Sequence, residues 1–301
     1  MRLLVLGANG QIGWELARSL TPLGEVIALD RAGCDLARPQ TIPDVIRNVR
    51  PDVLVNAAGY TAVDRAETDE SLAMLVNGTA VGVIAQEARQ AGALLVHYST
   101  DYVFDGAKPE PYVEDDPPAP LNAYGRSKLA GEVAARDAGG DHLILRASWV
   151  FAARGHNFLN TILRLARERG ELRVVADQVG APTWARHIAD ATAEVIACAQ
   201  RERGEQRFAS DVLHHTAAGA TSWHGFAEAI VDRACGSAPA RPAVRAITTD
   251  EFPSPARRPK NSRLSCERAR KRYGVALPDW AAGLAACLAD AGLPAPSEPA
   301  P

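Results

Sequence analysis

The first half of the chain alternates short apolar runs with stretches in which apolar residues recur every three or four positions. Residues 2–6 are nearly all apolar, which is typical of a parallel strand buried on both faces. The spacing of Ile12, Leu16 and Leu20 then predicts a helix. The same order repeats, with further strands expected at 25–30, 52–55, 93–98 and 142–145 and helices at 42–49, 71–91 and from about 123. This rhythm predicts an α/β fold with a doubly wound parallel sheet.

Beyond Trp149 the alternation weakens, and helical patterns are separated by connections that contain Gly and Pro. These helices are expected at 157–168, 185–199 and 223–234. We expect a Rossmann-type dinucleotide-binding domain and a smaller C-terminal substrate-binding lobe, and one segment could return from the lobe to the first domain. The expected ranges are 1–150 for the first domain, 185–215 for the returning segment, 151–184 and 216–290 for the lobe, and 291–301 for a loose proline-rich tail.

Composition narrows the function classes. The 301 residues carry a net charge of -3, which does not favour nucleic acid or an anionic membrane as a partner. No apolar run approaches the roughly 20 residues needed to span a bilayer, and the N-terminus reads as a strand rather than a leader. The five cysteines are widely spaced and form no CxxC pair, so we expect a reduced cytoplasmic protein without a zinc site.

A glycine-rich turn follows the first strand. Gly7, Gly10 and Gly13 have the GxxGxxG spacing, with Asn9, Gln11 and Ile12 between them. Such a turn lets a pyrophosphate approach the backbone and the unpaired N–H groups of the next helix. At the end of the second strand, Asp30 is placed to accept hydrogen bonds from ribose hydroxyls, whereas Arg31 suits a 2′-phosphate. We therefore expect NADPH or NADH to be accepted.

A phenol and an ammonium group lie four residues apart in Tyr124-Gly-Arg-Ser-Lys128, which puts them on one face of a helix. We expect Lys128 to lower the pKa of Tyr124, so that the phenol passes a proton to an alkoxide as hydride arrives. Thr100 follows a strand at the carboxyl edge of the sheet, where its hydroxyl can polarise a carbonyl group. Residues 56–59, with Ala57 and Gly59, open a small-residue loop beside the cofactor path.

These motifs resemble the extended short-chain dehydrogenase/reductase superfamily. Longer stretches resemble the dTDP-4-dehydrorhamnose reductase family more closely, over nearly the whole chain to about residue 290. HYSTDYVF, SWVF and DQxGAPT together are specific to that family. The matching stretches are GQIGWEL (10–16), RPDVLVNAAGYTAVDRAE (50–67), HYSTDYVFDG (97–106), LNAYGRSKLAGE (121–132), RASWVF (146–151), DQVGAPT (177–183) and RPKNSRL (258–264).

The resemblance implies reduction of dTDP-4-dehydro-β-L-rhamnose to dTDP-β-L-rhamnose, for cell-envelope polysaccharide synthesis. It implies that the cofactor is lined by Gly10–Ile12, Asp30, Asp35, Leu36, Gly59, Tyr60, Thr61, Tyr98, Tyr124 and Lys128. It implies that the sugar meets Thr100, Asp101 and Trp149, to which we add Asn157 and Arg263 as expected substrate contacts. Arginine forks such as Arg263 and the pair 257–258 suit a diphosphate, but a basic run is as often only solvated.

One departure from the family concerns a metal. Some members bridge two subunits through Mg²⁺ held by glutamates, one of them at the position of Arg186 and others near the C-terminus, where this tail has only Glu298. A cation cannot be a ligand of Mg²⁺, which requires oxygen donors. We therefore expect no structural Mg²⁺, and either a monomer or a homodimer without a metal bridge.

Two other functions stay open. A nucleotide-sugar dehydratase or epimerase shares these motifs, but elimination of water needs an acid and a base, and Asp101 is followed by Tyr102 rather than a second carboxylate. A non-catalytic regulatory subunit that binds NADP would have lost Tyr124, Lys128 or Thr100, and all three are present. His214 and His215 have no partners at metal-ligand spacing and read as an ordinary pair.

Overall fold

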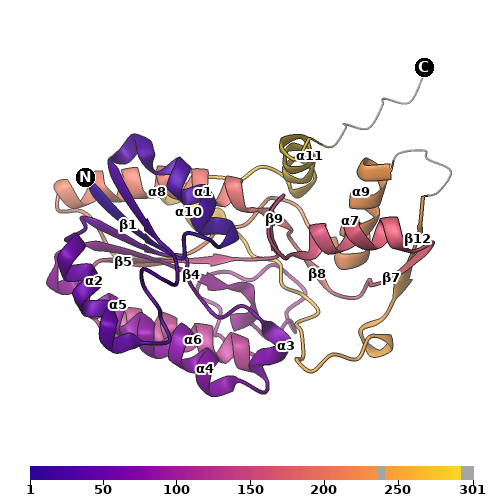
Figure 1. Ribbon diagram of the computed structural model, residues 1–301, viewed down its shortest axis with the longest axis horizontal. Coiled ribbons are helices and arrows are strands. Elements are labelled where there is room, and N and C mark those ends of the chain that lie inside the picture. The colour runs from indigo at the N-terminus through magenta and orange to yellow at the C-terminus, as the bar shows by residue number, and fades with distance from the viewer. Residues whose placement is uncertain (236–240, 293–301) are drawn as a thin grey trace.

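The computed structural model describes residues 1–235 and 241–292. Its centre is a six-stranded parallel sheet with the strand order β10-β5-β4-β3-β1-β2, which confirms the predicted doubly wound sheet (Figure 1). The strands of this sheet are β1 (Arg2–Leu6), β2 (Glu25–Leu29), β3 (Val53–Asn56), β4 (Leu94–Thr100), β5 (His142–Ala147) and β10 (Asp211–His214).

Alternation of side chains along β1 shows why the strand runs are so apolar. Leu3 and Val5 face one hydrophobic core, and Leu4 and Leu6 face another on the opposite side of the sheet. All four side chains are fully buried, because helices cover both faces. Helices α1 and α8 supply the first core, and α2, α5 and α6 the second (Figure 1).

The helices around the sheet are α1 (Gln11–Ser19), α2 (Ile42–Val49), α3 (Val63–Ala66), α4 (Glu70–Met74), α5 (Ala80–Gln90), α6 (Ala123–Asp137), α8 (Ala185–Gly204) and α10 (Glu267–Tyr273). The positions of α1, α2 and the start of α6 agree with the prediction, α8 extends beyond its predicted end at residue 199, and α3 and α10 were not predicted. Short 3₁₀ turns lie at Thr21–Leu23, Pro39–Thr41, Asp101–Val103 and Thr249–Glu251.

The helix expected at 71–91 is not continuous. A π-helical turn at Leu75–Thr79 separates α4 from α5, and it contains the buried Asn77. The Asn77 side chain bonds Tyr60 and Ser127 instead of facing an apolar core. Single π-turns of this kind occur frequently at functional sites.

After Trp149 the chain leaves the sheet and later comes back to it. Helix α8 packs against α1, and β10 pairs in parallel with β5, with Asp211 opposite Leu143. The expected segment 185–215 thus includes a helix and a strand that contact the sheet. The division of the chain into domains stays a prediction.

The remaining elements surround a third hydrophobic core with Phe226 and Leu284 near its centre. Their short strands pair as β6 with β9, β7 with β12, and β8 with β11. The elements are β6 (Val150–Phe151), α7 (Phe158–Glu168), β7 (Glu171–Val175), β8 (Val179–Gly180), β9 (Thr183–Trp184), β11 (Thr221–Ser222), α9 (Trp223–Cys235), β12 (Ala243–Ile247) and α11 (Trp280–Asp290).

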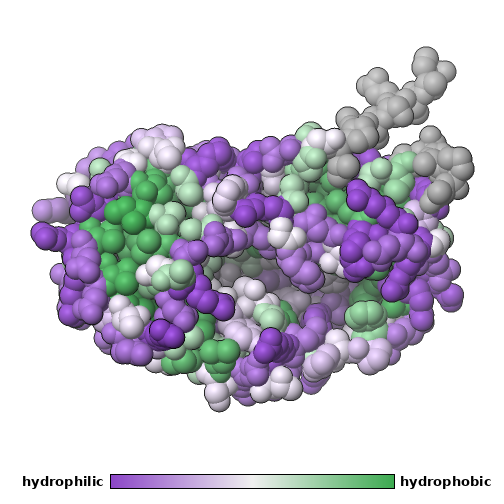
Figure 2. Space-filling view, viewed as in Figure 1, coloured by the Kyte–Doolittle hydropathy of each residue, from purple (hydrophilic) through white to green (hydrophobic). Residues whose placement is uncertain are grey.

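Within residues 1–235 and 241–292, no helix is long and apolar enough to cross a membrane. Most of the expected loose tail, residues 293–301 with Glu298, lies outside the described residues. The space-filling view shows a hollow near the middle of the visible face, and this hollow lies between the sheet and the third core (Figure 2). The carboxyl ends of the parallel strands lead toward this region (Figure 1).

Candidate active site

The glycine turn after β1 is built for close approach of a ligand to the backbone. Gly7 has φ +89°, and a Cβ atom there would lie 2.7 Å from the Ala58 nitrogen. A Cβ atom at Gly13 would lie 2.1 Å from the Gly7 carbonyl oxygen, so α1 packs directly on the turn. Gly10 precedes α1 without a side-chain cap, which leaves the first N–H groups of the helix available to an anion.

Asp30 organises the loop at the end of β2. Its Oδ1 atom accepts hydrogen bonds from the backbone N–H groups of Ala32 and Gly33, at 3.0 and 3.2 Å, and its Oδ2 atom accepts one from Asn9 at 2.8 Å. Both carboxylate oxygens are therefore already bonded within the protein. Arg31 and Arg38 line a shallow pocket beside this loop.

The two neighbouring residues that the resemblance assigned to the cofactor lie on different sides of this loop. Leu36 is buried in the core beneath the sheet, whereas Asp35 is partly exposed and accepts a hydrogen bond from the Ala37 N–H group. Ala57, Tyr60 and Thr61 follow the carboxyl end of β3, next to the glycine turn at the end of β1. The loop residues thus gather at adjacent strand ends, as in dinucleotide sites of doubly wound sheets.

The start of α6 carries the proton-transfer pair. The Asn122 side chain accepts a hydrogen bond from the Gly125 N–H group and donates one to the Arg257 carbonyl group, which fixes the first turn of the helix. Tyr124 and Lys128 lie one turn apart. Lys128 Nζ donates a hydrogen bond to the Tyr98 carbonyl oxygen at 2.6 Å.

The expectation that Lys128 makes Tyr124 acidic is wrong, because the pKa of Tyr124 is raised. Burial raises the pKa of Tyr124 to about 12, and the hydrogen bond with Thr100 only partly opposes this effect. Burial also lowers the pKa of Lys128 to about 8, although Glu132 one turn further along α6 favours the charged form. Loss of hydration is the largest cause of both shifts, and it disfavours the charged form of each group.

Asn77 links the loop after β3 to α6, the helix that carries Tyr124 and Lys128, and the sequence did not predict this role. Its Oδ1 atom accepts a hydrogen bond from the Tyr60 N–H group, and its Nδ2 atom donates to the Ser127 hydroxyl, at 2.8 and 2.9 Å. A Cβ atom on Gly59 would lie 3.1 Å from Asn77 Oδ1 and 3.9 Å from Lys128 Nζ. A polar residue inside an apolar helical pattern was the only signal.

Thr100, Asp101 and Tyr124 meet where β4 ends. Thr100 donates a hydrogen bond to Asp101 at 3.0 Å and lies close enough to Tyr124 to influence the pKa of its phenol. The Asp101 side chain is buried, and burial raises its pKa to about 7. Ser262, from the RPKNSRL stretch, lies beside this carboxyl group and accepts a hydrogen bond from the indole of Trp149.

Trp149 is held in an unusual conformation. Its φ is +46°, a left-handed value that a bulky residue rarely adopts. Its ring stacks on Trp223 with the centroids 3.5 Å apart and the planes within 3°. One face of the indole is thus covered by Trp223, and Gly180 also packs on the ring, since a Cβ atom there would lie 2.5 Å from Trp149 Cε2.

Asn157 and Arg263, the other expected substrate contacts, are bonded within the protein. The Asn157 side chain caps α7 and donates a hydrogen bond to Gln11 at 2.9 Å. Arg263 bonds Asn261 and the Pro109 carbonyl group. Neither side chain bonds Thr100, Asp101 or Tyr124, so the structure does not bring them into the same hydrogen-bond network.

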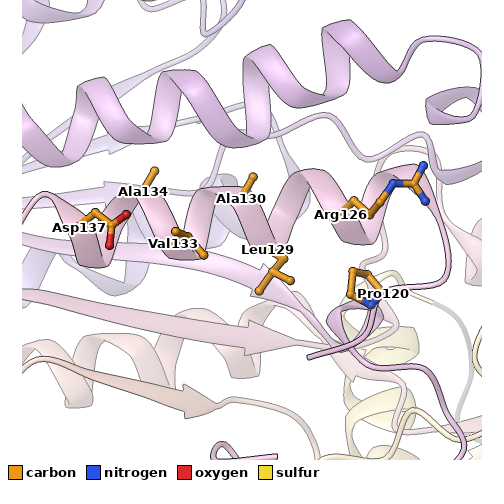
Figure 3. Close-up of a pocket in the computed structure, with 7 residues that line it drawn as sticks. All are labelled: Pro120, Arg126, Leu129, Ala130, Val133, Ala134 and Asp137. Atoms are coloured by element: carbon orange, nitrogen blue, oxygen red, sulfur yellow. The ribbon is translucent and has the colours of Figure 1, made fainter. Parts of the chain in front are cut away.

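The outer face of α6 carries a shallow surface groove. Leu129, Val133 and Asp137 line it together with Arg126 and Pro120 (Figure 3). These residues alternate along the helix with the buried positions that follow Tyr124, so the groove lies on the opposite side of α6 from the proton-transfer pair.

The residues at the position of the family's bridging metal do not fit Mg²⁺. The Arg186 guanidinium donates hydrogen bonds to Glu15 at 2.9 Å and to both carboxylate oxygens of Asp290 at 2.7 and 2.8 Å. A fixed positive charge already lies between the two acids, and it would repel a divalent cation. Among the described residues, no group of three or more His, Cys, Asp or Glu side chains could hold a metal ion.

Comparison with known proteins gives a consistent set of relatives. A family model described as the RmlD substrate binding domain matches residues 1–292. The dTDP-4-dehydrorhamnose reductase of Burkholderia thailandensis is 57% identical over 96% of this chain and 99% of its own length. That of Escherichia coli K12 is 44% identical over 94% of this chain and 96% of its own length.

Solved structures agree with these sequence relatives. A dTDP-4-dehydrorhamnose reductase from Bacillus anthracis in complex with NADP superimposes with a TM-score of 0.85, at 33% identity, over 96% of this chain and 99% of that one. A Bordetella bronchiseptica enzyme in complex with NAD is 18% identical with a TM-score of 0.75, and supports the fold alone.

Proposed function

The chain belongs to the dTDP-4-dehydrorhamnose reductase family, and from that membership we propose that it reduces the 4-keto group of dTDP-4-dehydro-β-L-rhamnose. The single observation that carries the mechanism is the meeting of Thr100, Tyr124 and Lys128 at the end of β4. A hydroxyl, a phenol and an ammonium group beside a dinucleotide turn are the parts that a carbonyl reduction needs.

The glycine turn fits a dinucleotide. Gly7 and Gly13 leave no room for a side chain, and the uncapped start of α1 offers N–H groups to a pyrophosphate. When bound, the reduced nicotinamide supplies the hydride. Gly59 keeps the space next to Lys128 open, since a side chain there would approach Asn77 and the lysine.

Tyr124 delivers the proton. A pKa of about 12 keeps the phenol protonated near neutral pH, which is the form that a proton donor must have. A developing alkoxide is a stronger base than a phenolate, so the transfer is still downhill. Lys128, anchored on the Tyr98 carbonyl group, is placed to stabilise the phenolate that remains.

Thr100 lies beside Tyr124 and can donate a second hydrogen bond to the keto oxygen as its negative charge grows. Trp149, held in place by Trp223 and by the bond to Ser262, is assigned to contact the sugar ring. We assign Asn157 to holding the loop before α7 and Arg263 to holding the Asn261 loop.

We infer that NADPH is preferred and NADH is accepted. The Asp30 oxygens are bonded to the loop and to Asn9, so this acid repels a 2′-phosphate less than a free carboxylate would. Arg38 is largely exposed, and its distance of 3.9 Å to Asp35 leaves it available beside Arg31. The Bacillus anthracis relative binds NADP, which is consistent with acceptance of NADPH.

The cofactor preference is tested with Arg31→Ala and Arg38→Ala. A charge-assisted hydrogen bond contributes about 1.5–3 kcal/mol, so each change should lower kcat/KM for NADPH about ten- to hundredfold and leave that for NADH nearly unchanged. Arg126→Ala, on the outer face of α6, is the matched control. Equal losses with both cofactors would contradict the assignment.

The activity itself is tested by turnover of the keto sugar with NADPH. Tyr124→Phe should lower kcat by about 10²–10⁴-fold, the usual contribution of a general acid, while NADPH still binds. An unaltered chain that consumes no NADPH with any dTDP-4-keto sugar would favour the regulatory-subunit alternative. Release of water from the substrate would favour a dehydratase.

We also propose that activity and assembly need no Mg²⁺, whether the chain is a monomer or a homodimer, because the Arg186 guanidinium already links Glu15 and Asp290.

A further inference from the structure

The hydroxyl of Thr100 has a fixed number of hydrogen bonds to give and to receive. It donates its one proton to Asp101 Oδ1 at 3.0 Å and accepts a hydrogen bond from the Tyr102 N–H group at 3.2 Å. The proton of Thr100 is thus used within the protein, and one lone pair of its oxygen remains.

This arrangement points the proton of Thr100 away from a substrate, because the hydroxyl gives it to the carboxylate. A keto oxygen that approached Thr100 would meet an oxygen lone pair and no donor. The hydrogen bonds seen with an ionised Asp101 are therefore wrong in direction for reduction of a carbonyl group.

Asp101 is the group that can reverse this direction. Its side chain is 2% exposed, and among the described residues its Oδ2 atom has no hydrogen-bond partner. The ionisable groups around it are the phenols of Tyr124 and Tyr102 and, beyond Tyr102, the guanidinium of Arg258, which pairs with Asp64. The Ser262 and Thr100 hydroxyls favour the ionised form, but burial outweighs them, because a buried carboxylate next to phenols and a distant cation is poorly compensated.

We propose that Asp101 is a positioning residue whose protonated carboxyl group turns the proton of Thr100 toward the keto oxygen. A protonated Asp101 donates to the Thr100 oxygen, whose two lone pairs are then filled by Asp101 and the Tyr102 N–H group. The proton of Thr100 is released, so its hydroxyl becomes a donor for the substrate beside Tyr124. The inference rests on the proposed reductase function and adds to it a residue that acts through Thr100.

The proton balance of the reaction does not change. The substrate carbon receives hydride and the keto oxygen receives the Tyr124 proton, which solvent then replaces. Asp101 keeps its own proton throughout and is not consumed. Burial raises the pKa of Asp101 to about 7, so both forms are populated at neutral pH.

The test compares the pH dependence of kcat in the parent chain and in Asp101→Asn. The asparagine amide donates at every pH, so it imitates the protonated acid. We expect kcat of the parent to fall about tenfold per pH unit above about pH 7, until the titration of Lys128 adds to the fall. Asp101→Asn should stay active and keep only the later fall near pH 8.

Asp105→Asn is the matched control, because hydrogen bonds from Ala107 and Tyr112 lower the pKa of Asp105 and keep it ionised throughout. An inactive but folded Asp101→Asn, with NADPH still bound, would show that the ionised carboxylate is needed and would overturn the proposal. An unchanged fall above pH 7 would overturn it as well. If Asp101→Asn does not fold, two variants of Thr100 provide the test. The kcat of Thr100→Ser must still decrease above about pH 7, and the kcat of Thr100→Val must not.

A second measurement needs no turnover. Infrared difference spectra of the parent chain with bound NADPH, recorded between about pH 6 and 8, should contain the C=O band of a protonated carboxylic acid. The same band should be present in the spectra of Asp105→Asn. Absence of this band would overturn the proposal even if the keto sugar is reduced. Presence of the band without any reduction would contradict the proposed function instead.

Discussion

Mild acid should destabilise this protein because three buried histidines are held neutral. Burial lowers the pKa of His214 to about 3 and that of His215 to about 4. The pKa of His97 is also held well below its ordinary value, by burial and by the nearby ammonium of Lys128. Unfolding releases all three to water, where imidazole binds a proton below about pH 6.5. The unfolded chain then binds more protons than the folded one, so stability must fall as the pH falls.

The size of the effect follows from these pKa values. Between pH 7 and pH 5 each of the three histidines costs about 2 kcal/mol, and together they cost about 6 kcal/mol. Asp101 acts in the opposite sense: its folded pKa of about 7 exceeds its ordinary 3.8, so the folded chain gains a proton in this range and recovers about 2 kcal/mol. His187 and Glu114 add smaller contributions of opposite sign. We expect a net loss of about 4 kcal/mol, a large part of the 5–15 kcal/mol typical of a folded chain.

Urea unfolding followed by circular dichroism at pH 5, 6 and 7 measures this loss directly. Asp101→Asn removes the opposing term, so its loss should grow to about 6 kcal/mol. His156 is exposed, and His156→Asn should leave the loss unchanged. An unfolding free energy that differs by less than about 1 kcal/mol between pH 7 and pH 5 would refute the reasoning, because it would mean that the buried imidazoles accept protons without unfolding.

Three further outcomes follow from packing and charge. Gly131→Ala should destabilise the chain by about 1–3 kcal/mol and lower kcat, because its Cβ atom would lie 2.1 Å from the Asn77 carbonyl oxygen; Gly82→Ala, with its nearest contact at 3.4 Å, should be tolerated in the same urea and turnover assays. Arg186→Ala should cost about 1–3 kcal/mol in urea unfolding, because it removes the guanidinium that bonds the buried Glu15. EDTA should change neither the turnover rate nor the molecular mass measured by light scattering. A decrease in the rate or in the molecular mass would contradict the absence of a metal bridge.

Much of the fold could be predicted because the signals are local. The strands are all apolar because they are buried on both faces. Glycine is required at positions 7 and 13 because a Cβ atom there would lie 2.7 and 2.1 Å from the nearest backbone atom. The spacing of Tyr124 and Lys128 puts them on one helix face whatever the rest of the chain does. The reductase family is confirmed by relatives that cover nearly the whole chain.

The rest depends on contacts between distant residues. The π-turn at Asn77 exists because its side chain bonds Tyr60 and Ser127, which lie 17 and 50 residues away. The pKa of Tyr124 depends on how deeply the phenol is buried, which its position four residues from Lys128 does not determine. Trp149 directly precedes β6 and Trp223 begins α9, so the stacking of their rings joins two segments that no sequence periodicity relates.

The late return of β10 to the sheet has a consequence for synthesis of the chain. Strand β5 ends at Ala147, but its outer neighbour begins only at Asp211. During translation, the backbone N–H and C=O groups along that side of β5 stay uncovered until more than sixty further residues have left the ribosome. An emerging polypeptide of about 150 residues would therefore present a ready template for strand pairing with its neighbours on a polysome, and it is at this stage that a chaperone would give the greatest gain in yield.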